Sequence, residues 1–515
     1  MKNILLLLSF FTLSLSQIQA QDKNKNNGDE EKFEYKGLLW EITGNGLKDT
    51  SYLYGTMHVS RKIAFNLDDI FFESLDKADM VAVESRPDRW LDFLFEDGKV
   101  GYTPSYGSLY GGYSNRNFYA SAFKMKFPDK MDIVRSMFGQ YQLINGLLYR
   151  SEGRVDFEED TYLDMFIYQS GKRFDKPTFS LEDYHESRDL VDQAYKDFRK
   201  KELDEWLTEL MEKKGVRQFE ITQDAYRDRN IGLIDSINRA MYTDNYMEHM
   251  LFKRNENMVD SMETLMRKGS LFTGVGAAHL PGEEGMIDML RKRGYILRPL
   301  FSDQTNRGKK IKSKFEDNFI EKAYEPQTTE DGFITVNCPN KIYELYSDGG
   351  SICISPDYDN GSYVTITRLY TYNMLREKSE RLDEEDLEKL LFEFIPGEIL
   401  SKNVVSEPYP GFDIQNETKT GNHQRYLFYV TPLEIIIIKM DGKKDFVKKE
   451  SNKVFPTIQF KDLKASTRTV NSNFGGFDVD MPGYTIINNS KYKGKRFIQA
   501  FDKQNGNFAF LMEKK

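Results

Sequence analysis

The sequence is poor in cysteine and histidine and carries no surplus of positive charge. Only two cysteines, Cys338 and Cys353, occur among 515 residues, which excludes a disulfide scaffold, although export would allow these two to bond. The net charge is -9 and no basic stripe is present, so we expect no nucleic-acid partner. Five histidines leave few candidates for imidazole chemistry.

Long hydrophobic runs are also absent after the first twenty residues. Lys2, the apolar run Ile4–Leu15 and the small residue Ala20 are typical of a secretory signal peptide. That run is shorter than the roughly 20 residues of a membrane span, and the densest later run, Ile435–Ile438, is typical of a buried strand. We therefore expect a signal peptide at 1–20, no membrane-spanning helix after its removal, and a periplasmic or secreted protein. Retention as an uncleaved anchor is the alternative.

The rest of the chain changes in composition several times. Its 39% hydrophobic content is typical of a globular protein, and its length allows at least two domains. From these changes we predict a disordered spacer at 21–35, an α/β domain at 36–301, a polar linker at 302–328 and a smaller α+β module of antiparallel strands at 329–464.

The last segment, 465–515, resembles the start of that module. Gly332-Phe333 followed by Pro339 is matched by Gly476-Phe477 followed by Pro482, and each is followed by a strand-like run and a turn with glycine. We interpret the segment as a truncated second copy; the alternative is two unrelated hairpins. On the first interpretation the module is a packing or interaction unit, and its expected partner is another envelope protein.

Within 36–301, short apolar runs alternate with longer amphipathic stretches. This alternation predicts a mostly parallel sheet with flanking helices, and such sheets carry their sites at the carboxyl ends of the strands. Strands are expected at 51–57, 80–84, 178–181, 270–275 and 295–300, and helices at 68–77, 130–149, 162–171 and 284–293, with a long helical region at 185–268 broken near Gly215. A Tyr-, Gly- and Ser-rich insert at 98–117 is predicted to be a surface loop, with a lid over the site as the alternative, and one helix is expected at 383–394.

Two of these strands end in the same short motif. Gly55 and Gly276 each stand three residues before a histidine, His58 and His279, in the pattern Gly-x-x-His. Glycine permits a tight turn at the strand tip and the close approach of a ligand. Neutral imidazole is both a metal ligand and a base near physiological pH. Two such tips in one parallel sheet can therefore form a shared site.

Two further strands end in a glutamate, Glu84 and Glu182. A carboxylate at the end of a buried strand needs a partner, a metal or a cleft, because isolated burial is costly. Two His and one Glu form a known ligand set for a catalytic divalent metal. Taken singly, each residue also has a structural explanation, such as capping a helix or pairing with an arginine. No rival nucleophile motif occurs in the sequence.

These motifs resemble the TraB/GumN family, which includes the Tiki proteases. The resemblance covers Gly37 to Leu300 and rests on Leu39–Ile42, Tyr54–His58, the strand ending in Glu84, Arg254-Asn255 and Gly274–Gly282. It implies a metal-dependent hydrolase, since the animal members are proteases that use manganese or cobalt; zinc is a further alternative.

The resemblance also implies roles for individual residues. The family pattern of two Gly-x-x-His motifs, a glutamate and an arginine carries over to His58, Glu84, Arg254 and His279, with Gly55 and Gly276 shaping the site. Glu182 occupies the place of a Gly-Leu-Glu motif, in which Ser180 replaces the glycine.

We hypothesise that His58, His279 and one glutamate, Glu84, bind a divalent ion that activates water for peptide hydrolysis. The remaining glutamate, Glu182, would transfer protons. Arg254 would stabilise an oxyanion or hold a substrate carboxylate, unless it only forms a salt bridge to a glutamate. The alternatives are a peptide-binding protein without turnover and a metal-free His/Glu esterase.

Overall fold

The structure is a computed structural model that describes residues 35–96, 144–146, 148, 150, 159–197, 201–347, 350–370, 388, 395–431, 433–461, 467–473, 475–481, 483–488, 495–502 and 507–514. Residues 1–35 and 36–515 are separate units, and only the second is described below. The expected signal peptide, spacer, insert at 98–117, and helices at 130–149 and 383–394 lie wholly or largely outside the described residues. Within the described residues, we find no helix whose length and hydropathy would let it cross a bilayer.

The first part of this unit is built on a six-stranded mixed sheet. Its strand order is β4-β3-β5-β2-β1-β6, in which β4, β3, β5 and β2 run parallel and β1 runs antiparallel to both β2 and β6. The expectation of an α/β fold with a mostly parallel sheet is therefore confirmed. The strands are β1 Leu39–Gly44, β2 Ser51–Thr56, β3 Met80–Val83, β4 Thr178–Ser180, β5 Leu271–Gly276 and β6 Tyr295–Leu300.

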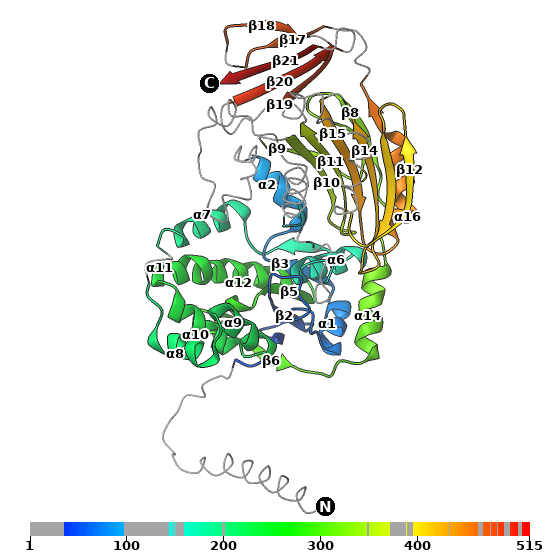
Figure 1. Ribbon diagram of the computed structural model, residues 1–515. Coiled ribbons are helices and arrows are strands. Elements are labelled where there is room, and N and C mark those ends of the chain that lie inside the picture. The colour runs from blue at the N-terminus through cyan, green and yellow to red at the C-terminus, as the bar shows by residue number, and fades with distance from the viewer. Residues whose placement is uncertain are drawn as a thin grey trace, which may run out of the picture. The chain divides into compact units, whose positions relative to one another are not determined.

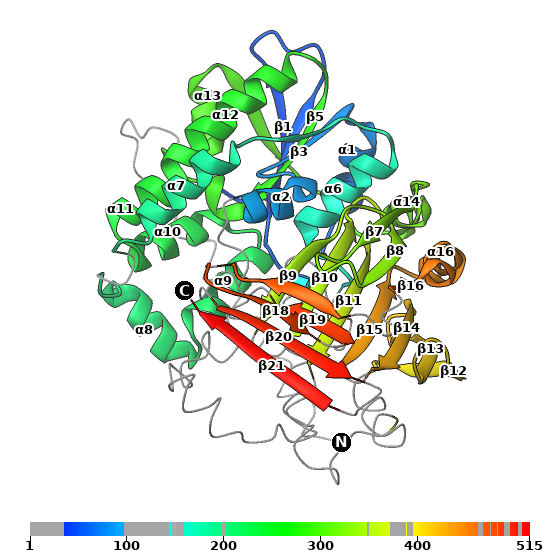
Figure 2. The same ribbon diagram turned by 90° about the horizontal axis from the view of Figure 1, so that it is seen from above.

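Helices cover both faces of this sheet. Helices α1 (Asp69–Lys77) and α6 (Leu163–Arg173) lie on one side, and α12 (Lys253–Met266) and α13 (Met286–Lys292) lie on the other (Figures 1 and 2). The predicted break near Gly215 is confirmed, because this glycine ends a helix with a positive φ of 66°. The remaining helices are α2 Trp90–Glu96, α7 Tyr184–Ala194, α8 Glu205–Lys214, α9 Gln218–Arg227, α10 Ile231–Met241 and α11 Asp244–Met247.

The second part is an antiparallel β module. Its large sheet has the order β12-β13-β14-β15-β11-β10-β9, and a small sheet has the order β16-β8-β7. The aliphatic run 435–438 forms a fully buried stretch of β15, as expected, and Ile436 and Ile438 pack into the module core. Cys338 and Cys353 are buried free thiols in the same core. The elements are β7 Glu325–Thr328, β8 Ile334–Cys338, β9 Tyr343–Ser347, β10 Gly350–Asp357, β11 Ser362–Tyr370, β12 Glu398–Val405, β13 Gly411–Glu417, β14 His423–Val430, β15 Glu434–Asp441, α16 Phe446–Glu450 and β16 Gln459–Phe460.

The segment 302–328, predicted to be a polar linker, contains regular secondary structure. It contains helix α14 (Asn306–Asp317), capped by the Thr305 hydroxyl, and then strand β7. The Phe315 side chain is buried and packs edge-on against Phe166 and Phe174 of the α/β domain. The Asp69 carboxylate also accepts from the backbone N–H groups of Thr305 and Gly308. These contacts hold the segment in place, and its average composition does not reveal them.

The end of the chain repeats the strand pairings of the module's start. Strands β17 and β18 pair as β7 and β8 do, and β19-β20-β21 follow the order of β9-β10-β11. The two corresponding hairpins close at Asp357–Ser362 and at Asp502–Asn507. This order agrees with the interpretation of a second copy, which stays a prediction. The strands are β17 Arg468–Asn471, β18 Asp478–Met481, β19 Tyr484–Asn488, β20 Lys495–Asp502 and β21 Asn507–Lys514.

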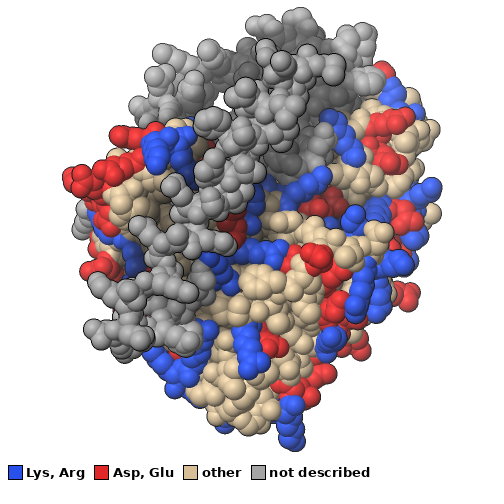
Figure 3. Space-filling model, turned by 90° about the horizontal axis from the view of Figure 1, so that it is seen from below, with Lys and Arg blue, Asp and Glu red and all other residues tan. Residues whose placement is uncertain are grey.

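The charged side chains of one face are visible in Figure 3. On the described part of that face, Lys and Arg are interspersed with Asp and Glu. The visible surface therefore carries mixed charge.

Candidate functional site

Four strand ends meet at one edge of the six-stranded sheet. Glu84 directly follows β3, His58 follows β2, Glu182 follows β4, and His279 lies in the short 3-10 turn after β5. These four strands are parallel neighbours, so their carboxyl ends lie side by side. The sheet therefore brings together side chains that are up to 221 positions apart in the sequence.

The two motif histidines face the same carboxylate oxygen. The Nε2 atoms of His58 and His279 each lie 3.7 Å from Oε1 of Glu84. Their ring nitrogens are consequently no farther apart than twice that distance, as a shared site requires. His279 is buried, whereas about half of the His58 side chain (49%) is exposed. The site is therefore accessible from the side of His58.

The other ring nitrogen of each histidine is held by a different partner. His58 Nδ1 donates to Asp164 at 2.9 Å, and Asp164 also accepts from the Thr56 hydroxyl at 2.5 Å. His279 Nδ1 donates to the Asn255 side-chain oxygen at 2.7 Å. The Asn255 amide is oriented, because its nitrogen donates to a backbone carbonyl at 2.7 Å. Both Nε2 atoms therefore point into the site as proton acceptors or metal ligands.

Arg254 connects the two glutamates. Its Nε and Nη2 donate to the two oxygens of Glu182 at 2.8 and 2.6 Å, and Nη2 also donates to Glu84 at 2.9 Å. Its Nη1 donates to the Met250 carbonyl at 3.2 Å. The salt-bridge interpretation of Arg254 is thus what the structure shows. Nη1 also contacts the Met250 sulfur at 3.8 Å, so the guanidinium makes five contacts within the protein and has little capacity left for substrate.

A short π-helix precedes this arginine. It spans Glu248–Phe252 and leads directly into α12, whose first residues include Arg254 and Asn255. A π-turn shifts the phase of the side chains that follow it and often occurs at functional sites. Here only Lys253 separates it from Arg254 and Asn255, which contact Glu84 and His279.

The glycines of the two motifs shape the site in different ways. A Cβ on Gly276 would lie 3.2 Å from His58 Nε2 and 3.3 Å from Glu84 Oε1, in the space between the chemical groups. A Cβ on Gly55 would instead lie 3.1 Å from the Ala277 backbone. The Gly276 N–H also donates to Glu84 Oε1 at 2.7 Å. Gly276 therefore keeps the centre of the site open and Gly55 allows close packing of the strand tips.

The charges of the site are unevenly distributed. Burial opposes the ionisation of Glu84, but His279, Arg254 and His58 outweigh it and hold its pKa well below the usual range. Burial raises the pKa of Glu182 and lowers the pKa of His279 to about 4. The carboxylate of Asp164 raises the pKa of His58 above its ordinary value. Glu84 is therefore an ionised acceptor beside one neutral and one readily protonated imidazole.

The donor atoms of the site are of a type that suits a divalent metal, although the side chains are not arranged around a common metal position. Two oriented imidazole nitrogens and a carboxylate oxygen match the His/Glu ligand type, and each imidazole has the second hydrogen bond that usually orients a ligand. Among the described residues, however, no group of three or more His, Cys, Asp or Glu side chains is arranged to hold a metal ion. Glu84 is engaged by Arg254 and by the Gly276 N–H.

Two residues of the site went unassigned in the sequence prediction. Asp164 lies 106 positions from His58 inside a predicted helix, and no local signal marks it. Asn255 adjoins Arg254 in the family-like motif, which was the available signal, but its role needs the position of His279. The replacement residue Ser180 accepts from a backbone N–H at 2.9 Å without displacing Glu182 from the site.

Together these features define an α/β protein with a His/Glu site at the carboxyl edge of its parallel strands. The chain belongs to the TraB/PrgY/gumN family, whose profile matches residues 38–299, about half of its length. No curated protein matches the chain significantly. A crystal structure from Bacteroides thetaiotaomicron VPI-5482 is 12% identical over 29% of this chain and 54% of its own, with a TM-score of 0.19. The chain thus spans about half of that protein, and the likeness is too weak to indicate a shared fold.

Proposed function

We propose that the protein is an exported, metal-dependent hydrolase that cleaves peptide bonds. The observation that supports this most strongly is the approach of both motif histidines to one oxygen of Glu84, each at 3.7 Å. The orientation of both rings through Nδ1 supports a role for the Nε2 atoms as ligands. The signal-like residues 1–20 support export to the periplasm or the medium.

In this proposal His58 and His279 hold the metal through Nε2, with Glu84 beside them. A bound manganese, cobalt or zinc ion would supply a water molecule that is acidic near neutral pH. Glu84 is the ionised carboxylate that faces the site, so it is the group placed to take the proton from the attacking water at Oε1. The proton that Glu84 takes from the water can then pass to the leaving amine, while His58, with Nδ1 held by Asp164, keeps its Nε2 for the metal.

Glu182 and Arg254 have positioning roles in this proposal. Glu182 uses both oxygens to bind Arg254, and its side chain is only 3% exposed, so it does not reach a substrate. Arg254 in turn holds Oε2 of Glu84 and leaves Oε1 directed toward the histidines. The Glu182–Arg254 pair therefore fixes the orientation of the reacting carboxylate.

The proposal is tested by elemental analysis of the mature protein after loading with manganese, cobalt or zinc. The wild type should retain about one ion per chain, and the His58→Ala, His279→Ala double variant should retain none. Variants His249→Ala and His423→Ala are matched controls, because both histidines bond elsewhere. Loaded wild type should then cleave members of a peptide library. Metal retention by the double variant would contradict the proposal, and binding of peptides without cleavage would indicate a peptide-binding protein.

One observation favours a second candidate, a metal-free esterase. Asp164 and His58 form a carboxylate–imidazole pair at 2.9 Å, and the ring is exposed enough to meet a substrate. Hydrolysis of esters that persists in excess chelator and is lost in Asp164→Asn would support this candidate over the first.

A further inference from the structure

Helix α6 carries the residue that orients His58. Asp164 is the second residue of α6, is buried, and accepts from both His58 and Thr56. The first turn of a helix has free N–H groups and is its least constrained part. Here the residue before the helix, Tyr162, does not cap it with its side chain. The position of Asp164 therefore depends on what holds α6 from outside.

The β module holds the carboxyl-terminal half of α6. Buried Arg173 donates to the backbone carbonyls of Asp359 and Asn360 at 3.1 and 2.8 Å. The hydroxyl of Tyr168, another α6 residue, donates to the Asp359 side chain at 3.0 Å. Gly361 packs so closely on this helix that a Cβ would lie 2.8 Å from Gln169. These contacts all come from one turn of the module, between β10 and β11.

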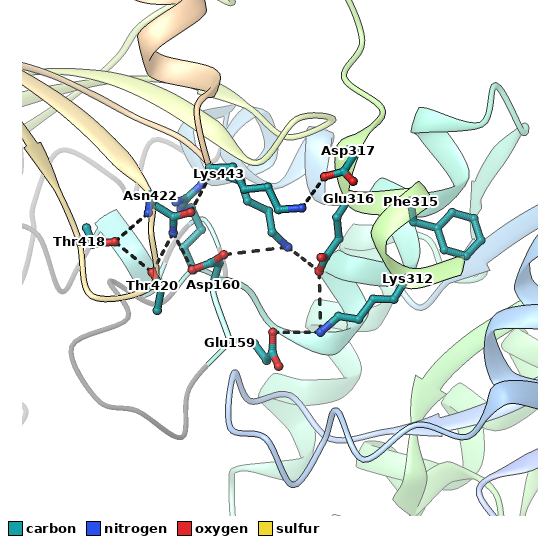
Figure 4. A network of polar contacts seen from close by, with 12 residues as sticks. Glu159, Asp160, Lys312, Phe315, Glu316, Asp317, Thr418, Thr420, Asn422 and Lys443 are labelled. Carbon is teal, nitrogen blue, oxygen red and sulfur yellow. Dashed lines mark hydrogen bonds and ion pairs between the residues drawn. The ribbon is translucent and has the colours of Figure 1, made fainter. Parts of the chain in front are cut away.

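The module also holds the segment that leads into α6. The Asn422 side chain donates to Asp160 at 2.6 Å, and Lys443 lies 4.0 Å from the same carboxylate (Figure 4). Lys443 also pairs with Glu316 of α14 at 2.6 Å. Lys312, one turn earlier on α14, pairs with Glu159 at 3.1 Å. The chain just before α6 is thus tied both to the β13–β14 and β15–α16 loops and to α14.

We propose that the β module is a structural part of the His/Glu site. By binding α6 at both ends it fixes the first turn of that helix, and so holds Asp164 against His58. The contacts include one buried and several partly buried hydrogen bonds to carbonyls or carboxylates. Removing one partner of such a bond is costly, because the other group is left without its hydrogen bond. The importance given to His58 rests on the proposed function. The coupling between the β module and the position of Asp164 does not.

The test compares two aspartates of the full-length protein. Asp359→Ala removes the acceptor of Tyr168 on α6 and also that of Lys322. Asp413→Ala is the matched control, because Asp413 is a similarly half-buried module residue that pairs with Arg425 within the module. Hydrogen exchange of the α6 amides is measured by mass spectrometry. The ring N–H signal of His58 is followed by NMR with labelled histidine and assigned from His58→Ala.

In Asp359→Ala the α6 amides should exchange about tenfold faster, as expected for the loss of a partly buried hydrogen bond. The His58 Nδ1–H signal should shift or broaden, and Asp413→Ala should change neither readout. Asp160→Ala, at the other end of the helix, should reproduce the effect and replaces Asp359→Ala if that variant does not fold. Unchanged readouts in the test variant, or equal changes in Asp413→Ala, would overturn the proposal. Both readouts are taken on metal-free protein, so a failure of the hydrolase proposal leaves this result interpretable.

Discussion

Replacing Gly276 with alanine should impair the function of the site while leaving the fold intact. The new methyl carbon would lie 3.2 Å from His58 Nε2, 3.3 Å from Glu84 Oε1 and 3.5 Å from His279 Cδ2. These neighbours are side-chain atoms, so they can retreat by a few tenths of an ångström. The backbone of Gly276, with φ -54° and ψ 134°, is accessible to alanine. Alanine also restricts the unfolded chain, which stabilises by about 0.4–1 kcal/mol, so we expect stability within about 1 kcal/mol of the wild type.

The matched control is Gly55→Ala, in the other motif. Its methyl carbon would lie 3.1 Å from both Cα and Cβ of Ala277 and 3.2 Å from a Leu280 methyl. The Ala277 Cα belongs to the backbone and cannot retreat cheaply. We therefore expect a loss of about 1–3 kcal/mol, the usual cost of overpacking a core. No atom of this variant would enter the space between the histidines.

Urea unfolding measures the stabilities, and calorimetric manganese titration measures metal affinity. Gly276→Ala should weaken manganese binding by about 10–100-fold, the usual effect of disturbing the surroundings of metal ligands. Its His58 and His279 ring signals should also shift in NMR spectra, which checks the geometry without metal. Unchanged ring signals, or a larger destabilisation in Gly276→Ala than in Gly55→Ala, would contradict these roles of the two glycines.

Three further outcomes follow from the same contacts. Arg254→Met should cost about 3–5 kcal/mol in urea unfolding, because it leaves the buried carboxylates of Glu84 and Glu182 without their cation; a loss below about 1 kcal/mol would contradict the buried bridge. Asn255→Ala removes the acceptor of His279 Nδ1 and should lower manganese affinity about 10–100-fold, with little change in α6 exchange. In chelator, stability should fall by about 3 kcal/mol between pH 6.5 and 4, because the unfolded chain takes up a proton that buried His279 resists. His279→Gln should flatten that profile in pH-dependent unfolding, and an unchanged slope would exclude His279 as its source.

The site was only partly predictable from the sequence. His58, His279 and Glu84 could be found because each lies at the end of an apolar run, and a strand end is a local feature. The partners of Arg254 could be anticipated as carboxylates. The simultaneous contact with Glu84 and Glu182 could not, since it depends on the spacing of β3 and β4 in the sheet.

The segment 302–328 shows what composition alone does not predict. Residues 302–328 are polar and basic, yet α14 packs through Phe315 and its lysines bind carboxylates of the α/β domain. Whether a charged side chain is solvated or paired depends on the surface opposite it, and that surface is distant in sequence.

The sequence by itself determined the alternation of strands and helices, the antiparallel character of the module, and the placing of two histidines and two glutamates at strand ends. These properties follow from the periodicity of neighbouring residues, which sets local structure. Only the tertiary structure decided which nitrogen of His58 and His279 faces the site, because Asp164 and Asn255 contact them from helices α6 and α12. The contacts between the β module and α6 are also visible only in the tertiary structure. Hydrogen bonds between segments distant in sequence form only when the packed core brings the two surfaces together.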